Sequence, residues 1–139
     1  NPNTPEALLQ HLAKDEDWNL RRGVASNPNT PEAVLQQLTK DEYRWVRERV
    51  ARNPNTPVAA LQQLAQDEYE GVLREVAENP NAPVTLLQQL AACAGSTVVR
   101  GGVARNPNTP EALLQQLTRD EDKKVRAIAI IALILKRRS

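Results

Sequence analysis

The sequence predicts an all-α solenoid of five stacked helix-pair repeats, with a period of about 26 residues. The motif Asn-Pro-Asn-Thr-Pro, once Asn-Pro-Asn-Ala-Pro, begins at residues 1, 27, 53, 79 and 106. Self-similarity at a fixed period of this length is the signature of a stacked-repeat architecture. Two short segments with apolar residues at helical spacing follow each motif, so each repeat is predicted to be a pair of helices. Aromatic residues are scarce, and the core is therefore expected to be leucine, valine and alanine.

The motif itself predicts a helix boundary. Proline fixes φ and lacks an N–H group, so two prolines three residues apart end one helix and begin the next. We expect Thr4 to cap the first helix of its repeat and Pro5 to be the first helical residue. The equivalent threonines are Thr30, Thr56 and Thr109, whereas the fourth repeat has Ala82. The asparagines are predicted to bond the turn backbone or to adopt the left-handed conformation at a helix end.

The predicted repeats form one domain and comprise residues 1–26, 27–52, 53–78, 79–105 and 106–139. The fourth repeat carries one extra residue, and it contains Gly95, Gly101 and Gly102, which lower helix propensity. We predict that it is the least stable unit or a place where the stack bends. In the fifth repeat the second helix continues through the isoleucine-rich residues 128–135, and we expect a C-terminal capping helix. The alternatives are a dimer interface or a tail that touches a membrane.

Composition excludes several classes of protein. The chain has 18 basic and 17 acidic residues, which argues against a dominant polyanion-binding surface. A single cysteine, Cys93, excludes an internal disulfide and a multi-cysteine metal site. No nucleophile–base pair, phosphate loop or metal-ligand spacing is present, so the sequence predicts neither an enzyme nor a cofactor. Without a signal peptide or spanning segment, a cytoplasmic location is expected. The start of the chain at the first residue of a repeat suggests a segment of a longer protein.

The repeat pattern resembles the bacterial leucine-rich repeat variant family. In the second repeat the residues that carry the resemblance are Asn27–Pro31, Leu35, Leu38, Asp41, Val46, Arg47, Val50 and Ala51. The resemblance covers essentially the whole chain and implies a right-handed superhelix of paired helices, in which one layer can be partly 3₁₀. We expect α-helix in both layers. The pattern is also similar to HEAT-type repeats. Members of both families serve mainly as interaction scaffolds, so the resemblance implies binding rather than chemistry.

Three sets of side chains are candidates for function. Arginines occupy one repeat position (Arg21, Arg47, Arg100 and Arg126) and aspartates another (Asp15, Asp41, Asp67 and Asp120). These rows are expected to bond between neighbouring repeats, and the alternative is a positive groove for an anionic partner. All four aromatic residues lie just before or at the start of a second helix, and tryptophan and tyrosine are enriched at binding hot spots. They either bind a partner or cover gaps between repeats. His11 is expected to be a surface variant and Cys93 an inert thiol.

The sequence therefore predicts a non-catalytic scaffold that binds a protein or peptide. The predicted partner-binding residues are Trp18, Arg22, Tyr43, Trp45, Arg47, Arg49 and Tyr69. The alternative is binding of nucleic-acid backbone through Arg44, Arg47, Arg49, Arg52, Arg100 and Arg105, although Glu48, Glu75 and Glu78 interrupt them. A salt titration separates the two, because phosphate contacts weaken steeply with salt. The open ends of the stack also predict end-to-end self-association.

Overall fold

The computed structural model describes residues 3–93 and 95–139, and these residues form ten helices and no strand. The first helices of the repeats are α1 (Glu6–Leu12), α3 (Glu32–Leu38), α5 (Val58–Leu64), α7 (Val84–Ala92) and α9 (Glu111–Leu117). The second helices are α2 (Trp18–Ser26), α4 (Arg44–Arg52), α6 (Glu70–Glu78), α8 (Thr97–Arg105) and α10 (Lys123–Arg138). The predicted all-α stack of helix pairs is confirmed, and both helices of each pair are α-helical.

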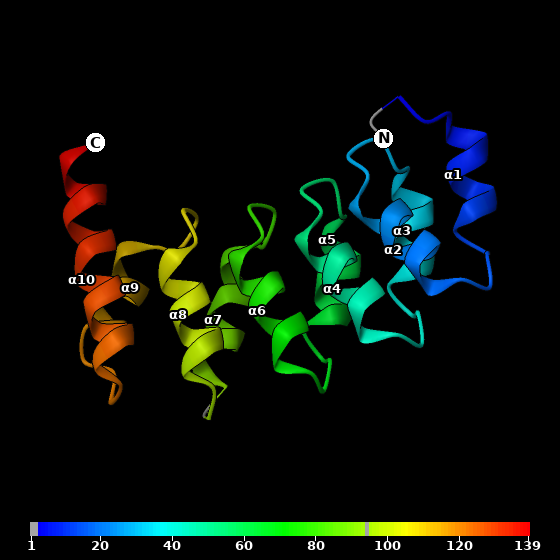
Figure 1. The fold of residues 1–139 in the computed structure, drawn as a ribbon. Coiled ribbons are helices and arrows are strands. Elements are labelled where there is room, and N and C mark those ends of the chain that lie inside the picture. The colour runs from blue at the N-terminus through cyan, green and yellow to red at the C-terminus, as the bar shows by residue number, and fades with distance from the viewer. Residues whose placement is uncertain (1–2, 94) are drawn as a thin grey trace.

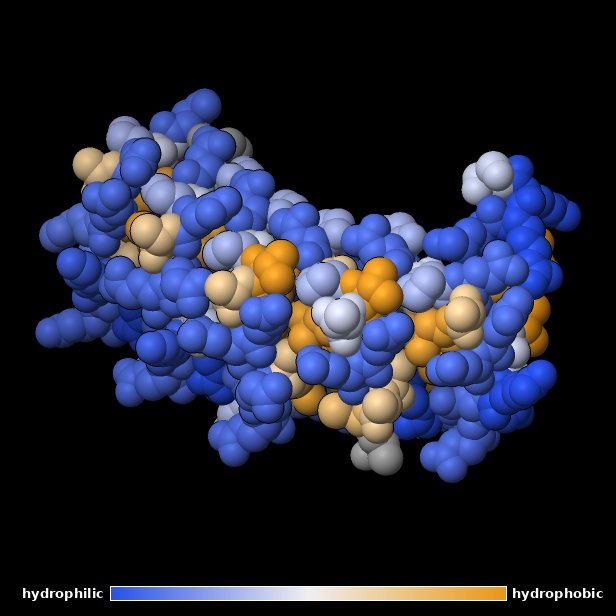
Figure 2. All heavy atoms as spheres, turned by 180° about the vertical axis from the view of Figure 1, so that it is seen from behind, coloured by the Kyte–Doolittle hydropathy of each residue, from blue (hydrophilic) through white to orange (hydrophobic). Residues whose placement is uncertain are grey.

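The second helices form one continuous layer. α2 packs on α4, α4 on α6, α6 on α8 and α8 on α10, whereas the first helices touch one another far less. Figure 1 shows α1 and α10 far apart, with the edge that carries the Asn-Pro-Asn loops hollowed between them. From behind, hydrophobic side chains form separate spots in a mostly hydrophilic surface, and the same edge is hollowed (Figure 2). The second-helix layer is therefore the structural spine of the stack.

Small and branched apolar side chains fill the space between the helices. Val46, Val50 and Ala51 of α4 are completely buried, and so are Leu35 and Leu61 of the first helices. Burying one leucine or valine side chain contributes about 1.5–3 kcal/mol. Helices of seven and nine residues depend on this burial, because helices of that length are marginal alone in water.

The threonine of each motif does not cap the helix that follows it. Pro31 is the N-cap of α3, with φ −60° and ψ 149°, and its carbonyl accepts the first helical hydrogen bonds. The hydroxyl of Thr30 instead donates to the carbonyl of Val24, in the last turn of α2, at 2.6 Å. Thr56 and Thr109 make the same bond in their repeats. The predicted cap is therefore wrong by one residue, because the threonine is buried and satisfies the end of the preceding helix.

Ala82 is the one described equivalent of these motif threonines that has no side-chain hydroxyl. The carbonyl of Val76 accepts the N–H of Asn79 but receives no side-chain donor from the described residues. Ala82→Thr is expected to stabilise the chain by about 1 kcal/mol, the net contribution of one buried hydrogen bond. Urea unfolding monitored by circular dichroism measures this difference. Thr56→Ala is the matched reverse change and should destabilise by a similar amount; a loss of stability in both variants would contradict the prediction.

The asparagines join one repeat to the next. The amide of Asn53 donates to the carbonyls of Ala25 and Asn27, at 2.8 and 3.0 Å, and its oxygen accepts the N–H of Asn55. Asn79 and Asn106 make equivalent bonds one and two repeats later. A second row crosses the same boundary, in which Asn55, Asn81 and Asn108 donate to Pro28, Pro54 and Pro80. Of the two alternatives predicted for these asparagines, bonding of the turn backbone is confirmed. None of the described asparagines adopts the left-handed conformation, because among the described residues only Gly95 has a positive φ.

The glycines of the fourth repeat have different surroundings. A Cβ atom on Gly102 would lie 3.1 Å from Ala77 Cβ and 3.3 Å from Glu78 Cγ, so the absence of a side chain lets α8 approach α6 closely. A Cβ atom on Gly101 would meet Arg105 and Ile128 at ordinary distances of 3.5 and 3.6 Å. Whether this repeat is the least stable stays a prediction.

These surroundings predict opposite effects for the same substitution. Gly101→Ala should stabilise the chain by up to about 1 kcal/mol through helix propensity. Gly102→Ala should destabilise it by about 1 kcal/mol net, since overpacking costs more than the propensity gained. Parallel urea titrations of the two variants measure both effects. Equal shifts in the same direction would show that the contact between α6 and α8 is not tight.

The last helix, α10, is sixteen residues long and continues beyond the length of the other second helices. Val125, Ala129 and Leu133 are buried along one side of it. The opposite side exposes four large apolar residues by 47–62%: Ile130, Ile131, Ile134 and Leu135. α10 therefore covers one side of the fifth repeat while its own far side stays open.

Candidate interaction surface

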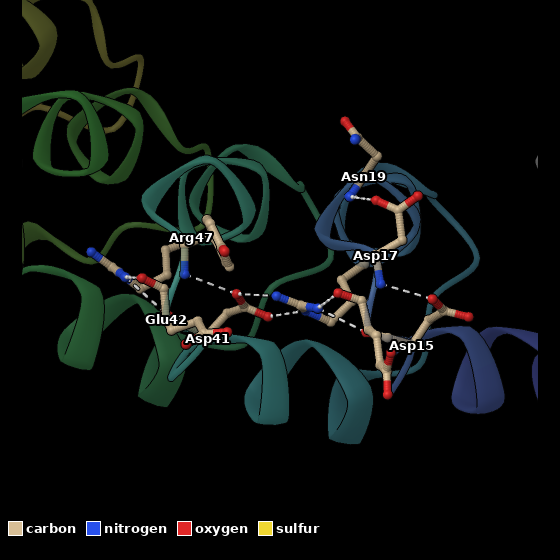
Figure 3. Close-up of polar contacts among 9 residues, drawn as sticks. Asp15, Asp17, Asn19, Asp41, Glu42 and Arg47 are labelled. Carbon is tan, nitrogen blue, oxygen red and sulfur yellow. Dashed lines mark hydrogen bonds and ion pairs between the residues drawn. The ribbon is translucent and has the colours of Figure 1, made fainter.

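Arginine and aspartate side chains pair between consecutive repeats. Arg21 binds Asp41 through Nε and Nη2 at 2.7 and 3.2 Å, and Arg47 binds Asp67 at 2.6 and 3.3 Å. Arg100 binds Asp120 in the same two-point way. The remaining nitrogen of Arg47, Nη1, donates to the backbone carbonyls of Asp41 and Glu42. Figure 3 shows Asp15, Asp41 and Arg47 following one another along the stack.

The carboxylates in these pairs also organise the turn before the second helix of their own repeats. Asp41 Oδ1 accepts the backbone N–H of Tyr43 at 3.0 Å, and Asp67 does the same for Tyr69. Arg21 is 10% exposed and Asp41 6% exposed at the side chain, so solvent screens the pair weakly. These rows bond between repeats, as one of the two sequence interpretations expected.

The arginine–aspartate pair is absent at the boundary between the third and fourth repeats. The third repeat has Leu73 where the others have arginine, and the fourth repeat has no aspartate in the turn that would face it. Both partners are absent together, so neither repeat leaves an unpaired buried charge at this boundary. Loss of a single partner would be costly, because an uncompensated buried charge destabilises more than a pair stabilises.

The pair at the last boundary makes stability depend on pH. The hydrogen bond from Arg100 lowers the pKa of Asp120, and burial opposes this only in part. A lowered pKa contributes stability that is present above the carboxyl's unfolded pKa, about 3.9, and is lost as pH falls through the folded pKa. We expect Asp120→Asn to show a smaller fall in the free energy of unfolding than the wild type between about pH 5 and pH 2.

Chemical unfolding at a series of pH values measures this slope. Glu121→Gln is the control, because it neutralises the neighbouring carboxyl, which is 89% exposed at its side chain. The control should keep the slope of the wild type. Identical slopes in all three proteins would contradict the contribution assigned to Asp120.

Three of the four aromatic residues form one cluster. The rings of Trp18 and Tyr43 are stacked, with centroids 5.8 Å apart and an interplanar angle of 17°. Trp45 lies 5.4 Å from Trp18 and 6.4 Å from Tyr43. Tyr69 contacts no other ring among the described residues. Tyr43, Trp45 and Tyr69 are exposed by 37%, 42% and 39%, so this cluster is accessible from solvent.

Arginine side chains connect the rings into a single surface. Arg44 lies between two of them, with its guanidinium carbon 4.9 Å from the Trp45 centroid and 5.1 Å from the Tyr69 centroid. Arg22 lies 5.4 Å from the centroid of Trp18. Cation–π contacts of this kind contribute about 0.5–1 kcal/mol when exposed. We call Trp18, Arg22, Tyr43, Arg44, Trp45 and Tyr69 the aromatic–arginine patch.

The other two predicted partner-binding residues, Arg47 and Arg49, are not part of this patch. Arg47 lies 5.6 Å from the Tyr69 centroid, but its charge is already paired with Asp67. Arg49, in the last turn of α4, is half-buried and makes no ring contact or ion pair among the described residues. Sequence reasoning left Arg44 out of this set. Its position beside Trp45 was visible, but its bridge to Tyr69 needs the spacing of α4 and α6.

Most arginines of the predicted nucleic-acid surface are paired with carboxylates. Beside Arg47 and Arg100, Arg52 binds Glu75 at 2.7 Å and Arg105 lies 3.5 Å from Glu78. Burial raises the pKa of Glu75, but hydrogen bonds and charge from Arg52 and Arg74 outweigh it, so the pKa is lowered overall. Only Arg44 and Arg49 of that set have no ion pair in the described chain.

Two segments of the chain, residues 44–68 and 97–122, match the family model described as leucine rich repeat variant. Both segments are similar to leucine-rich variant repeats. Each matched segment begins at a second helix and runs through the next proline loop and first helix to the acidic turn. The resemblance inferred from the motif is therefore confirmed in these segments. No match was found among curated proteins.

Two hollows of the surface lie away from the aromatic–arginine patch. A groove of about 700 Å³ runs along the proline loops between Pro28 and Asn81, and a cleft of about 460 Å³ lies between α7 and α9. The sequence did not predict either one, because both arise from the spacing of neighbouring repeats. Across residues 3–93 and 95–139, no group of three potential metal ligands lies together. Within the same residues, no helix is long and apolar enough to cross a membrane.

Proposed function

We propose that the chain is a non-catalytic scaffold that binds a protein or peptide segment at the aromatic–arginine patch. The observation that carries this proposal is the continuous row from Arg22 through Trp18, Tyr43 and Trp45 to Arg44 and Tyr69. Tryptophan, tyrosine and arginine are the residue types most enriched at binding hot spots. The rings lie on the packed second-helix layer, so they lose little conformational freedom when a partner binds.

The charge of the patch favours a partner with acidic side chains beside apolar ones. Arg22 and Arg44 form no ion pair among the described residues, and each has its guanidinium over a ring. The N–H groups at the edge of such a guanidinium can donate to a carboxylate, while the neighbouring ring offers apolar contact. Both kinds of contact are available within one short peptide.

Nucleic-acid binding has weaker support. Four of the six arginines in that alternative, Arg47, Arg52, Arg100 and Arg105, lie within 4 Å of a carboxylate oxygen in the stack. An arginine paired in this way contributes little to phosphate binding, and the formal net charge of the chain is only +1.

Peptide selection from a random displayed library provides the test, with synthetic copies of the selected peptides as probes. We expect acidic and aromatic sequences to be enriched, and Trp18→Ala/Trp45→Ala to bind them at least tenfold more weakly. Val58→Ala/Val84→Ala is the matched control, because these side chains are exposed to a similar extent, 41% and 40%, on the first helices. Circular dichroism of both variants checks that the fold is retained.

A second probe separates the two classes of partner. An oligothymidylate should bind weakly or not at all. Its tight binding, with a dissociation constant that rises steeply with salt, would overturn the proposal in favour of nucleic acid. Equal binding of the selected peptides to the wild type and the double-tryptophan variant would also overturn it.

A further inference from the structure

The groove along the proline loops is built from the same residue types in successive repeats. It has a volume of about 700 Å³ and lies on the hollowed edge of the stack (Figure 1). Its lining contains the run Pro28–Pro31 of one loop and the equivalent run Pro54–Pro57 of the next, and Asn81 adds a third loop. The groove therefore crosses the second, third and fourth repeats, on the edge opposite the acidic turns.

Asparagine side chains present hydrogen-bonding groups to this groove. Asn55 and Asn81 each donate an amide N–H to a proline carbonyl of the preceding repeat, and both side chains are exposed. A carboxamide has two N–H donors and an oxygen that accepts. Within the described chain, the Oδ1 atoms of these two residues accept no hydrogen bond. Each repeat therefore offers one acceptor to the backbone N–H of a ligand.

The spacing of the loops selects the conformation of such a ligand. The second helices of neighbouring repeats pack directly on one another, and packed helices lie about 8–10 Å apart. A polyproline II helix has three residues per turn and a rise of about 3.1 Å, so its faces repeat every 9.3 Å or so. A β-strand repeats its faces every two residues, about 6.8 Å. Only the polyproline II helix keeps the same face toward each successive loop.

Glu32, in the lining of the groove, lacks the partner that its equivalents have. Glu6 and Glu111 each accept a hydrogen bond from the glutamine four residues later, at 3.4 Å. After Glu32 that glutamine is Gln36, which instead donates to Gln63 of the next repeat at 3.0 Å. The Glu32 carboxylate is exposed and forms no ion pair or hydrogen bond with the described residues. Among the residues that line the groove it is the only one that ionises, so the groove is negative.

The fifth repeat shows how a basic side chain binds at this position. Glu111 is the equivalent of Glu32, and its Oε1 accepts from Arg137 Nε and Nη2 at 3.1 and 2.8 Å. A guanidinium therefore reaches the first residue of a first helix from the side of the loops. The charge of the groove and this example both favour a partner that carries an arginine.

We propose that the groove binds a proline-rich segment of another protein in the polyproline II conformation, with an arginine of that segment on Glu32. Every third residue of the segment faces the asparagine row and donates its N–H to an asparagine Oδ1. The proline rings of the segment pack on the proline rings of the loops and on Val58, which is 41% exposed. This surface is separate from the aromatic–arginine patch, and the proposal does not depend on peptide binding there.

Isothermal titration calorimetry of the whole chain with capped synthetic peptides tests the proposal. The probes contain about nine residues, an arginine and alanine–proline–proline repeats, with the arginine at either end because the spacing does not fix the direction of the segment. At least one of the two should saturate at micromolar concentration. Replacing its arginine with the neutral isostere citrulline should weaken binding about threefold, the effect of one exposed ion pair. Replacing its prolines with threonine should abolish binding, because threonine favours the strand conformation.

Single substitutions locate the peptide on the chain. Glu32→Gln should weaken the arginine peptide about threefold and leave the citrulline peptide unchanged. Asn55→Ala should weaken both peptides about tenfold, because it removes a backbone contact that both of them make. Glu42→Gln is the control, since it neutralises an exposed carboxyl in the acidic turn on the opposite edge, and it should bind both peptides like the wild type. Circular dichroism checks that each variant keeps the fold.

Several results would overturn this proposal. Neither arginine peptide might saturate up to about 1 mM, which is the affinity of a non-specific contact. The threonine peptide might bind as tightly as the proline peptide, or Glu32→Gln might affect the arginine and citrulline peptides equally. Trp18→Ala/Trp45→Ala should bind the proline peptide like the wild type. A loss of binding in that variant would place the peptide at the aromatic–arginine patch and so contradict a site in the groove.

Discussion

Asn79→Ala should destabilise the chain by about 3 kcal/mol. The Asn79 amide donates to the carbonyls of Ala51 and Asn53 at 2.6 and 3.0 Å, and its oxygen accepts the N–H of Asn81 at 2.8 Å. The side chain is buried, with the residue 2% exposed. Each lost hydrogen bond costs about 1 kcal/mol, and buried carbonyls left without a donor add to this cost.

The same substitution also removes a connection between the second, third and fourth repeats. In a repeat stack, stability is close to a sum of repeat terms and nearest-neighbour interface terms. Weakening one interface should therefore broaden the urea transition or divide it into two steps, with a lower m value. Equilibrium unfolding followed by circular dichroism measures both the free energy and the shape of the transition.

Asn81→Ala is the matched control, because it removes the same side chain from an exposed position in the same loop. Asn81 donates to the carbonyls of Pro54 and Thr56, where water can replace it. A loss of less than about 1 kcal/mol is expected there. Similar losses of unfolding free energy in the two variants would contradict the prediction, because they would show that burial of the Asn79 amide does not determine how much it stabilises the chain.

Asp67→Asn should be the next most damaging change, with a loss of about 2–3 kcal/mol. The amide keeps an oxygen that accepts the N–H of Tyr69, but it removes the negative charge that pairs with Arg47. The Arg47 side chain is 14% exposed, so it is left charged and mostly dehydrated. Removing one partner of such a pair costs several kcal/mol when burial is complete, and the residual exposure reduces this figure.

The chain itself indicates the compensating change. Leu73 stands at the position of Arg47 one repeat later, at the boundary where the aspartate is also absent. Arg47→Leu/Asp67→Asn should therefore recover at least half of the stability that Asp67→Asn loses. Thermal and urea unfolding of the wild type, both single variants and the double variant complete a double-mutant cycle. Additive losses would contradict a direct coupling between the two side chains.

The helix-pair architecture was predictable because its determinants are local. Proline restricts φ at its own position and the residue before it avoids the α region, whatever surrounds them. The repeated motif therefore places every helix end within a few residues, and the Leu-x-x-Leu and Val-x-x-x-Val-Ala spacings identify the buried sides. The error at Thr30 has a local cause as well: a cap rule considers the helix that follows, whereas the hydroxyl bonds the carbonyl of Val24 in the helix that precedes.

The candidate surface was predictable in part. The sequence grouped Trp18, Tyr43, Trp45 and Tyr69 in one window of the repeat, and the structure brings the first three into contact. It did not separate Arg44, which bridges Trp45 and Tyr69, from Arg47, which also binds Asp67. Neighbouring residues on one helix point in different directions, and only the position of the adjacent helix decides which one is paired.

The sequence alone determined the fold class, the number of repeats and the rows of equivalent side chains, because these follow from short-range steric rules applied at a constant period. The tertiary structure decided which polar groups bond across a boundary, as Asn53 does to Ala25 and Arg21 to Asp41, more than 15 residues away. It also decided which cations have no ion pair among the described residues, including the Arg44 guanidinium. The physical reason is that hydrogen bonds and ion pairs act over a few ångströms, and only stacking brings residues one repeat apart within that range.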